Sequence, residues 1–166
     1  MSSYWEKRQK LKYYREALRL AKKYAPAGGS ILDVGSYDCE YITWFDWFEK
    51  KQVIDLTKPV ILDGVISTTG NFMEFECANL FDLVLCLQVL EHLHNPKEFC
   101  QKLLVTGRLI IISVPYQWER GRSASHVQDP VDEHKLQGWT GKPWKEMTIV
   151  TDGRCDRLVA VYEGNP

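Results

Sequence analysis

Apolar residues recur at every seventh position near the N-terminus, which is typical of one face of a helix. The spacing is carried by Tyr4, Leu11, Leu18 and Ala25. Lysines and arginines occupy much of the sequence between them, and a proline and two glycines follow. Since these residues end helices, we expect one N-terminal helix within residues 1–27 that covers the core.

Beyond this helix, short apolar runs predict buried strands. They occupy residues 30–34, 52–56, 60–67, 82–87 and 108–114. Two helices are expected between the runs. Asp38 can cap the first, which would extend to about Lys50 and is rich in aromatic residues. Pro96 begins the second, and Gly107 ends it.

The last part of the chain has a different pattern. A polar, loop-like stretch covers residues 116–144, and two β-like runs follow at 147–150 and 158–162. The turn residues Asp152 and Gly153 lie between these runs and predict a hairpin. The alternation of strands and helices before it predicts an open, mostly parallel α/β sheet with an antiparallel hairpin at its edge.

Composition narrows the class of protein. A chain of 166 residues fits one domain. The net charge of −1 offers no basic field for nucleic acid, so no nucleic-acid partner is expected. No apolar run approaches the roughly 18–20 residues that span a bilayer, and the first residues carry no signal-peptide core. Five scattered cysteines without a CxxC pair indicate a reducing compartment, hence the cytoplasm.

Candidate ligand-binding residues lie where the predicted parallel strands end. Ligands of open α/β sheets bind beyond the carboxyl ends of the strands. The residues at four such ends are Asp33, Gly35, Ser36 and Tyr37; Asp55 and Leu56; Asn71, Phe72 and Met73; and Leu87, Gln88 and Val89. Taken singly, a glycine after a strand is usually a turn and an aspartate usually a surface carboxylate. Their joint appearance in order favours a binding site.

These residue types suit an adenosine with a charged tail. Gly35 allows the backbone to approach a ligand closely. Asp55 follows it by 20 positions (55 − 35) and can accept hydrogen bonds from both ribose hydroxyls. Phe72 and Met73 can enclose the adenine ring between them.

The two remaining polar groups suit the ends of the same ligand. The side chain of Asn71 can pair with the exocyclic amine of adenine. Asp33 can hold an ammonium group, directly or through water. Together with the preceding residues, they predict a site for a nucleoside that carries an amino-acid tail.

Four segments resemble the motifs of class I, S-adenosylmethionine-dependent methyltransferases. ILDVGSYDCEYI is similar to the first motif, VIDL to the acidic second motif, FDLVLCLQVLEHLHNP to the fourth-strand motif and GRLIIISVP to the fifth-strand motif. The third of these is similar to the small-molecule branch seen in quinone-biosynthesis and sugar-modifying enzymes. The resemblance covers residues 30–115 and, more loosely, the final hairpin.

The resemblance implies a Rossmann-like, seven-stranded α/β sheet with a reversed last strand and helices on both faces. It implies S-adenosylmethionine as cofactor and S-adenosylhomocysteine as product. Residues 30–115 would be the cofactor-binding core of a single domain, 116–146 an acceptor loop and 147–163 an edge hairpin. The nearest rivals lack their motifs, since neither the G-x-G-x-x-G of dehydrogenases nor a P-loop is present.

The chain departs from the family pattern at three positions. The first motif usually carries three glycines, and only Gly35 matches, with Tyr37 and Cys39 in the other two places. Asn71 stands where an aspartate is common. These differences favour a second interpretation, in which the chain is a non-catalytic, cofactor-binding or scaffold subunit of methyltransferase type.

The acceptor is expected to be a small polar molecule, such as a sugar or another metabolite, methylated on a hydroxyl or amine. Such transfer often needs a base, and the candidates are His92, His126 and His134. The alternative is that His92 belongs to a capping and packing pair and that the other two merely lie in a polar loop. The HxH pattern, together with the later aspartate and histidine residues, could hold a metal ion, but the ligand spacing is not distinctive, so no metal is expected.

The aromatic segment after the first motif raises the question of a partner. Trp44 and Trp47 would lie on different faces of the predicted helix, and exposed aromatic patches mark interfaces. One interpretation is a homodimer or a partner subunit bound through this helix. The favoured alternative is that the N-terminal helix and the final hairpin cover the rings.

Overall fold

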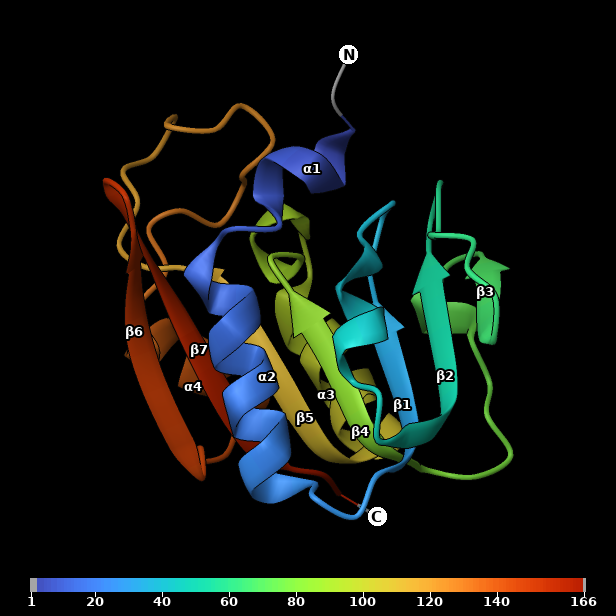
Figure 1. Ribbon diagram of the computed structural model, residues 1–166. Helices are drawn as coiled ribbons and strands as arrows, with labels where there is room; N and C mark the ends of the chain where they lie inside the picture. The colour runs from blue at the N-terminus through green and yellow to red at the C-terminus, as the bar shows by residue number, and fades with distance from the viewer. Residues whose placement is uncertain (1–2, 166) are drawn as a thin grey trace.

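A computed structural model describes residues 3–165, which form a single seven-stranded sheet (Figure 1). The strands are β1 (Gly29–Val34), β2 (Phe48–Asp55), β3 (Val65–Thr69), β4 (Phe81–Leu87), β5 (Gly107–Pro115), β6 (Glu146–Asp152) and β7 (Cys155–Glu163). Their order across the sheet is β3-β2-β1-β4-β5-β7-β6. Strands β1 to β5 pair in parallel, and β7 is antiparallel to both β5 and β6. This confirms the predicted fold class, including the hairpin at the edge.

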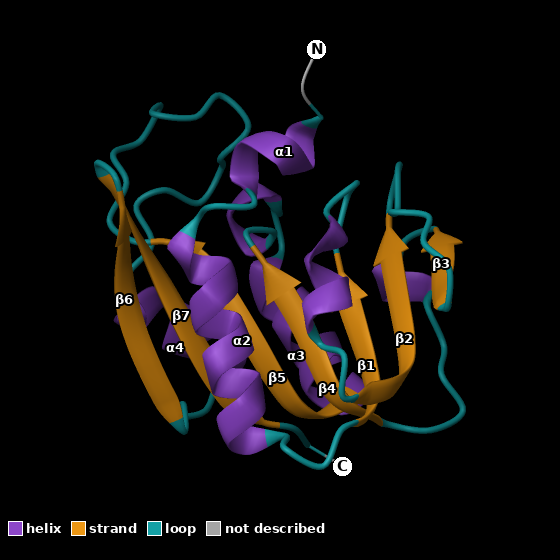
Figure 2. Ribbon diagram, in the orientation of Figure 1, coloured by secondary structure: helices purple, strands orange, loops and turns teal. Residues whose placement is uncertain are grey.

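Helices cover both faces of the sheet, as predicted (Figure 2). They are α1 (Tyr4–Arg8), α2 (Lys12–Tyr24), α3 (Pro96–Thr106) and α4 (Glu133–Thr140). Helix α2 packs on one face, and α3 and α4 pack on the other. Three short 3₁₀ turns, η1 (Glu40–Trp44), η2 (Phe72–Glu74) and η3 (Leu90–His92), follow strand ends or the loops beyond them. None of the helices within residues 3–165 is long and apolar enough to cross a membrane.

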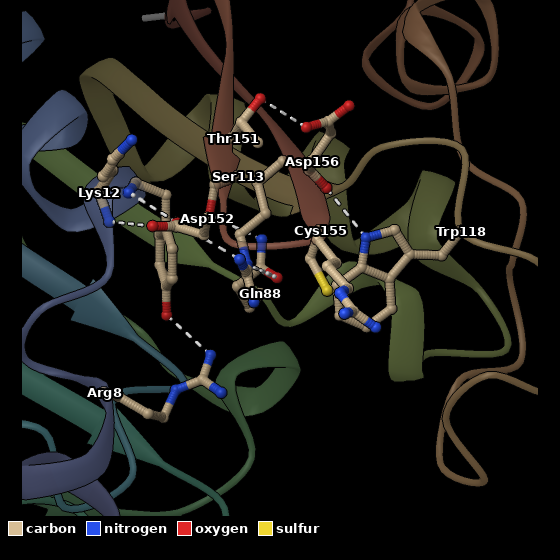
Figure 3. A network of polar contacts seen from close by, with 12 residues as sticks. Arg8, Lys12, Gln88, Ser113, Trp118, Thr151, Asp152, Cys155 and Asp156 are labelled. Carbon is tan, nitrogen blue, oxygen red and sulfur yellow. Dashed lines mark hydrogen bonds and ion pairs between the residues drawn. The ribbon is translucent and has the colours of Figure 1, made fainter.

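The single N-terminal helix predicted for residues 1–27 is wrong, because the segment forms two helices. The backbone N–H groups of Lys12 and Tyr13 donate to the carboxylate of Asp152 on β6, at 2.6 and 3.4 Å (Figure 3). This contact caps α2 and separates it from α1. The buried face of α2 consists of Tyr13, Tyr14, Ala17, Leu20 and Ala21. Leu11 and Leu18 from the seven-residue pattern are only partly buried at its margin.

The aromatic helix predicted from Asp38 to about Lys50 is also wrong. Only η1 forms there, and β2 already begins at Phe48. The aromatic side chains are held by tertiary packing: Trp5 lies 5.5 Å from Trp44, between ring centroids, and Trp47 donates to the carbonyl of Ala25 at 2.9 Å. The two N-terminal helices therefore cover the rings, and the aromatic helix proposed as a partner surface does not exist.

Two smaller differences concern the loops. Strand β3 begins at Val65, five residues later than predicted, and α4 lies inside the stretch predicted as loop. Asp132 caps α4 by accepting from the backbone N–H of Lys135 at 2.8 Å. Gly141, at φ +70°, ends it in the left-handed conformation that favours glycine. Helix α4 is short, and its polar residues hide the signal of its buried face.

Candidate functional site

A cleft of about 330 Å³ opens at the carboxyl ends of β1, β2, β3 and β4. The predicted cofactor residues that line it are Gly35, Tyr37, Asp55, Leu56, Asn71, Phe72, Gln88 and Val89. The structure adds Tyr4, His92, Leu93 and Phe99, among others. This size is within the range of small-molecule sites. Residues from four strand ends thus meet at one place, and α1 lies across the same end of the sheet (Figure 1).

The floor of the cleft is formed by Gly35. Its φ is +79°, and a Cβ built there would lie 2.5 Å from Cγ2 of Val89. Its N–H donates to the carbonyl of Ile54 at 2.8 Å. The position therefore requires glycine for its backbone conformation and for the space it leaves. As a result, Val89 can pack directly against the backbone of the turn after β1, where both residues line the cleft.

Asp55 at the end of β2 holds two loops in place. One carboxylate oxygen accepts from the Tyr37 N–H at 2.9 Å, and the other accepts from the N–H groups of Thr57 and Lys58, each at 2.9 Å. Partial burial alone would raise the pKa of Asp55, but these donors hold it below its usual value. Asp55 therefore carries a fixed negative charge at the edge of the cleft.

Tyr37 occupies a position that glycine normally fills, and the backbone keeps the glycine conformation. Its φ is +48°, in the left-handed region. The ring packs edge-on against Tyr4 of α1, with ring centroids 5.3 Å apart, and Lys58 Nζ lies 5.3 Å from its centroid. The bulk of the side chain is thereby taken up by contact with α1.

The residues after β3 divide between two places. Phe72 is buried against Phe99 and lines the cleft. Asn71 is exposed at its edge, where its carbonyl accepts from the Met73 N–H at 3.0 Å and its amide donates to Glu74. Met73 lines a neighbouring pocket instead of the cleft. The expected enclosure of adenine between Phe72 and Met73 therefore has only one of its two walls.

A small polar cavity adjoins the cleft on the side of β1 and α1. Among its lining residues are Arg8, Gly35, Ser36, Leu87 and Gln88. The guanidinium of Arg8 donates to the hydroxyl of Tyr13 at 2.9 Å, while its buried Nε has no hydrogen-bond partner among residues 3–165. Arg8 could not be identified from the sequence, because nothing there distinguishes it from the other cations of the N-terminal segment.

Asp33 is fully buried and is connected to this cavity through Tyr41, which lines it. Its Oδ1 accepts from the Tyr41 hydroxyl at 2.5 Å, and its Oδ2 has no partner within the described residues. Burial raises the pKa of Asp33 to about 7. The carboxyl group is thus poised to ionise when a cation comes near.

Gln88 connects the cleft to the C-terminal hairpin (Figure 3). Its φ is +60°, and its N–H donates to the carbonyl of Ser113 at 2.9 Å. Its side-chain carbonyl accepts from Nε of Arg157 at 3.1 Å. Arg157 is buried and also pairs with Asp152 at 3.3 Å. The hairpin therefore fixes the side chain that follows β4.

A polar cluster lies where η3 meets the loop after β5. Nε2 of His92 lies 3.9 Å from Oε1 of Glu91, and the rings of His92 and His126 lie 4.8 Å apart between centroids. Nδ1 of His126 lies 2.8 Å from Oδ2 of Asp129. Burial raises the pKa of Glu91 to about 8 and lowers that of His92. His92 also lines the cleft, so the cluster adjoins it directly.

The three candidate histidines do not all meet. His92 and His126 are neighbours, whereas His134 is exposed in the first turn of α4. Its side chain takes part in no hydrogen bond or ion pair recorded within residues 3–165. Asp129 and Glu91, which complete the cluster, come from separate segments that only the fold brings together.

Of three comparisons with known proteins, the two that found matches both found methyltransferases. A family model described as a methyltransferase domain matches residues 4–147. No curated protein sequence matches the chain. A solved structure of Burkholderia thailandensis 1,6-didemethyltoxoflavin-N1-methyltransferase, with S-adenosylhomocysteine bound, is similar with a TM-score of 0.79. It is 16% identical, and the match covers 95% of this chain and 80% of that one.

Two further structures are similar in fold. The N-methyltransferase NodS of Bradyrhizobium japonicum has a TM-score of 0.74 and 16% identity over 93% of this chain and 96% of that one. Magnesium protoporphyrin IX methyltransferase of Synechocystis, with S-adenosylhomocysteine bound, has a TM-score of 0.73. Its identity is 10% over 93% of this chain and 83% of that one. At these identities the structures demonstrate a shared fold.

Proposed function

The chain belongs to the methyltransferase-domain family, as a class I S-adenosylmethionine-dependent enzyme, and on this premise we propose that it methylates a hydroxyl or amine of a small polar metabolite. The observation that carries the proposal is the contact between the cleft and the cluster of Glu91, His92 and His126. A nucleoside-sized cleft at the strand ends thereby adjoins groups that can bind and deprotonate an acceptor.

The residues of the cleft fit the adenosine part of the cofactor. Gly35 and Val89 form the floor of the cleft, and Phe72 offers an apolar wall for adenine. The ionised carboxylate of Asp55 would accept from the ribose hydroxyls. When bound, the cofactor supplies an electrophilic methyl group on a sulfonium and remains as S-adenosylhomocysteine after transfer.

The adjoining polar cavity fits the amino-acid tail. The unpartnered Nε of Arg8 would donate to the carboxylate of the tail. Asp33, behind the lining residue Tyr41, has one oxygen without a partner in the described part of the chain, and it would hold the ammonium group directly or through water. Both buried groups would then have a partner of opposite charge.

On the acceptor side, we assign the proton-handling role to His92 and His126. His92 lines the cleft, and Asp129 fixes the ring orientation of His126. His134 is exposed and outside this cluster, so the proposal does not use it. Small acceptors are also those named for similar folds, since the Burkholderia enzyme holds 1,6-didemethyltoxoflavin and an EvdMO1 domain was solved with D-fucose.

Calorimetric titration with S-adenosylmethionine and S-adenosylhomocysteine tests the cofactor site. We expect both to bind, and Asp55→Ala to weaken them by about 10–100-fold, the value of a hydrogen bond to a charged group. Asp63→Ala, at an exposed aspartate outside the cleft, is the matched control. Failure of both ligands to bind the native chain would contradict the proposal.

Measurement of turnover distinguishes an active enzyme from a chain that only binds the cofactor. Formation of S-adenosylhomocysteine is followed with a panel of amines, sugars and phenols. His126→Ala should slow turnover of an accepted substrate and leave cofactor affinity unchanged. Cofactor binding without turnover of any acceptor would favour the interpretation as a non-catalytic subunit.

A further inference from the structure

We propose that Glu91, His92 and His126 bind a divalent transition-metal ion, with Zn²⁺ as the representative, at the acceptor end of the cleft. One ligand atom from each of these residues lies within 4.8 Å of the others. Two imidazole nitrogens with one carboxylate oxygen form a common ligand set for such ions. The sequence led us to expect no metal, because the histidine spacing is not distinctive and the three ligands come from two segments that meet only in the fold.

The hydrogen bonds of the two rings leave the correct nitrogens free. Nδ1 of His92 lies 3.0 Å from the carbonyl oxygen of Ser125, which can only accept, so this nitrogen carries the proton. Nδ1 of His126 lies 2.8 Å from the carboxylate of Asp129. Both Nε2 atoms therefore keep a lone pair. A second ring nitrogen bonded to a carbonyl or carboxylate is the usual arrangement around metal-bound histidines.

The charge of the cluster supplies an independent argument. Glu91 and Asp129 are 1% and 2% exposed, and in the part of the chain that the structure describes each has one carboxylate oxygen without a hydrogen-bond partner. Within residues 3–165, neither forms an ion pair with a lysine or arginine. Buried carboxylates without compensation are costly. A divalent cation among Glu91, His92 and His126 would bind the Glu91 carboxylate directly and give Asp129, behind His126, a nearby positive charge.

The two segments that supply the ligands are joined to each other. The backbone N–H groups of Val127 and Gln128 donate to the carbonyl of Glu91, at 2.9 and 3.2 Å. Trp118 stacks on His126 at 5.4 Å between centroids. Since metal–ligand distances in such sites are about 2.0–2.2 Å, the ligand atoms would have to move together by on the order of 1 Å. Rotation of the imidazole side chains can supply most of this shift.

The position of the site gives it a role in the proposed methyl transfer, on which this part of the inference rests. Three protein ligands leave at least one coordination position open. His92 lines the cleft, so that position would face the acceptor. With both Nε2 lone pairs on the metal, the histidine pair would act through the ion, which would bind the acceptor oxygen and lower the pKa of its hydroxyl, and the proton would pass to solvent water.

Metal binding is measured on the full chain after treatment with a chelator, by titration with Zn²⁺ and by the visible spectrum with Co²⁺. The Cys77→Ser background removes an exposed thiol that would compete for both ions. We expect one ion per chain and loss of that binding in His92→Ala, His126→Ala and Glu91→Gln. His94→Ala is the matched control, because His94 is exposed and lies outside the cluster.

Asp129→Asn keeps all three ligands and tests only the contribution of the carboxylate that is bonded to His126. It should weaken Zn²⁺ binding by about 10–100-fold, as loss of a partner behind a ligand does. Circular dichroism of each metal-free variant shows whether its fold is retained.

Absence of stoichiometric binding to the native chain would overturn the proposal, as would equal weakening by His94→Ala and His92→Ala. These titrations need no S-adenosylmethionine. A chain that binds the cofactor and no metal therefore refutes this inference alone, and the reverse result refutes the proposed function alone.

Discussion

Gly35 and Val89 face each other across the floor of the cleft with no room for a Cβ between them. The distance from a Cβ on Gly35 to Cγ2 of Val89 would be 2.5 Å. Gly35→Ala should therefore destabilise the fold by about 1–2 kcal/mol through its left-handed backbone and by about 1–3 kcal/mol more through overpacking. The free energy of unfolding from urea titration measures the sum.

Gly64→Ala is the control for Gly35→Ala. Gly64 has φ +72°, close to the +79° of Gly35, but a Cβ there would meet nothing within 4 Å. It should therefore lose only the backbone contribution, and its cofactor affinity should not change. Equal destabilisation by the two substitutions would show that contact with Val89 does not matter.

Arg8→Ala should distinguish the two ends of the cofactor. If Arg8 holds the carboxylate of the tail, affinity for S-adenosylhomocysteine falls by about 10–100-fold. Affinity for methylthioadenosine, which lacks the amino-acid tail, should stay the same. Lys7→Ala, at an exposed neighbour on α1, should change neither. A parallel loss for both ligands would assign Arg8 to the support of α1 instead.

The buried carboxyl group of Asp33 predicts a pH dependence of stability. Its pKa is about 7 in the folded chain, against about 3.9 when unfolded. Between these values the folded chain holds a proton that the unfolded chain releases. Its contribution to stability is therefore greatest at low pH and falls by about 1.4 kcal/mol per unit as pH rises towards 7, then levels off.

Asp33→Asn removes this titration. Urea denaturation of both proteins at several pH values between about 4 and 8 should show a stability difference that grows in favour of the variant as pH rises. Other buried groups titrate equally in the two proteins, so the difference isolates Asp33. A difference that does not change with pH would contradict the assignment.

Arg157→Leu should destabilise the chain by about 3–5 kcal/mol, because it leaves the buried carboxylate of Asp152 without its cation. It should also weaken cofactor binding, since Gln88 loses a partner at the edge of the cleft. Guanidinium denaturation measures the first effect and calorimetry the second. The double variant with Asp152→Asn should recover part of the stability. If it does not, charge pairing is not the cause.

Much of the fold could be predicted because its strongest signals are local. The apolar run of β4 and the proline at the start of α3 place these elements almost correctly. The aromatic segment around Trp44 misled the prediction, since its spacing resembles a helix while Trp5 and Tyr14 determine its packing. Helical periodicity in a sequence does not reveal burial against distant residues.

The candidate site, too, could be predicted from the sequence only in part. Parallel strands end at one edge of a sheet, so the order of Gly35, Asp55 and Gln88 along the chain was enough to bring them together. Met73 was misplaced because the short turn η2 directs it into another pocket. Arg8 and Asp129 could not be found from sequence, because their significance lies in unpartnered atoms that only three-dimensional packing reveals.

The contact between Lys12 and Asp152 also bears on how the protein is made. The two residues are 140 positions apart, so the group that caps α2 is synthesised 140 residues after the helix start that it caps. Until Asp152 is in place, the N-terminal N–H groups of α2 lack this partner, and α1, which is connected directly to the start of α2, is not held at the cleft by it. The cofactor end of the sheet is therefore completed only after the C-terminal hairpin has formed, although α1 itself is synthesised long before that hairpin.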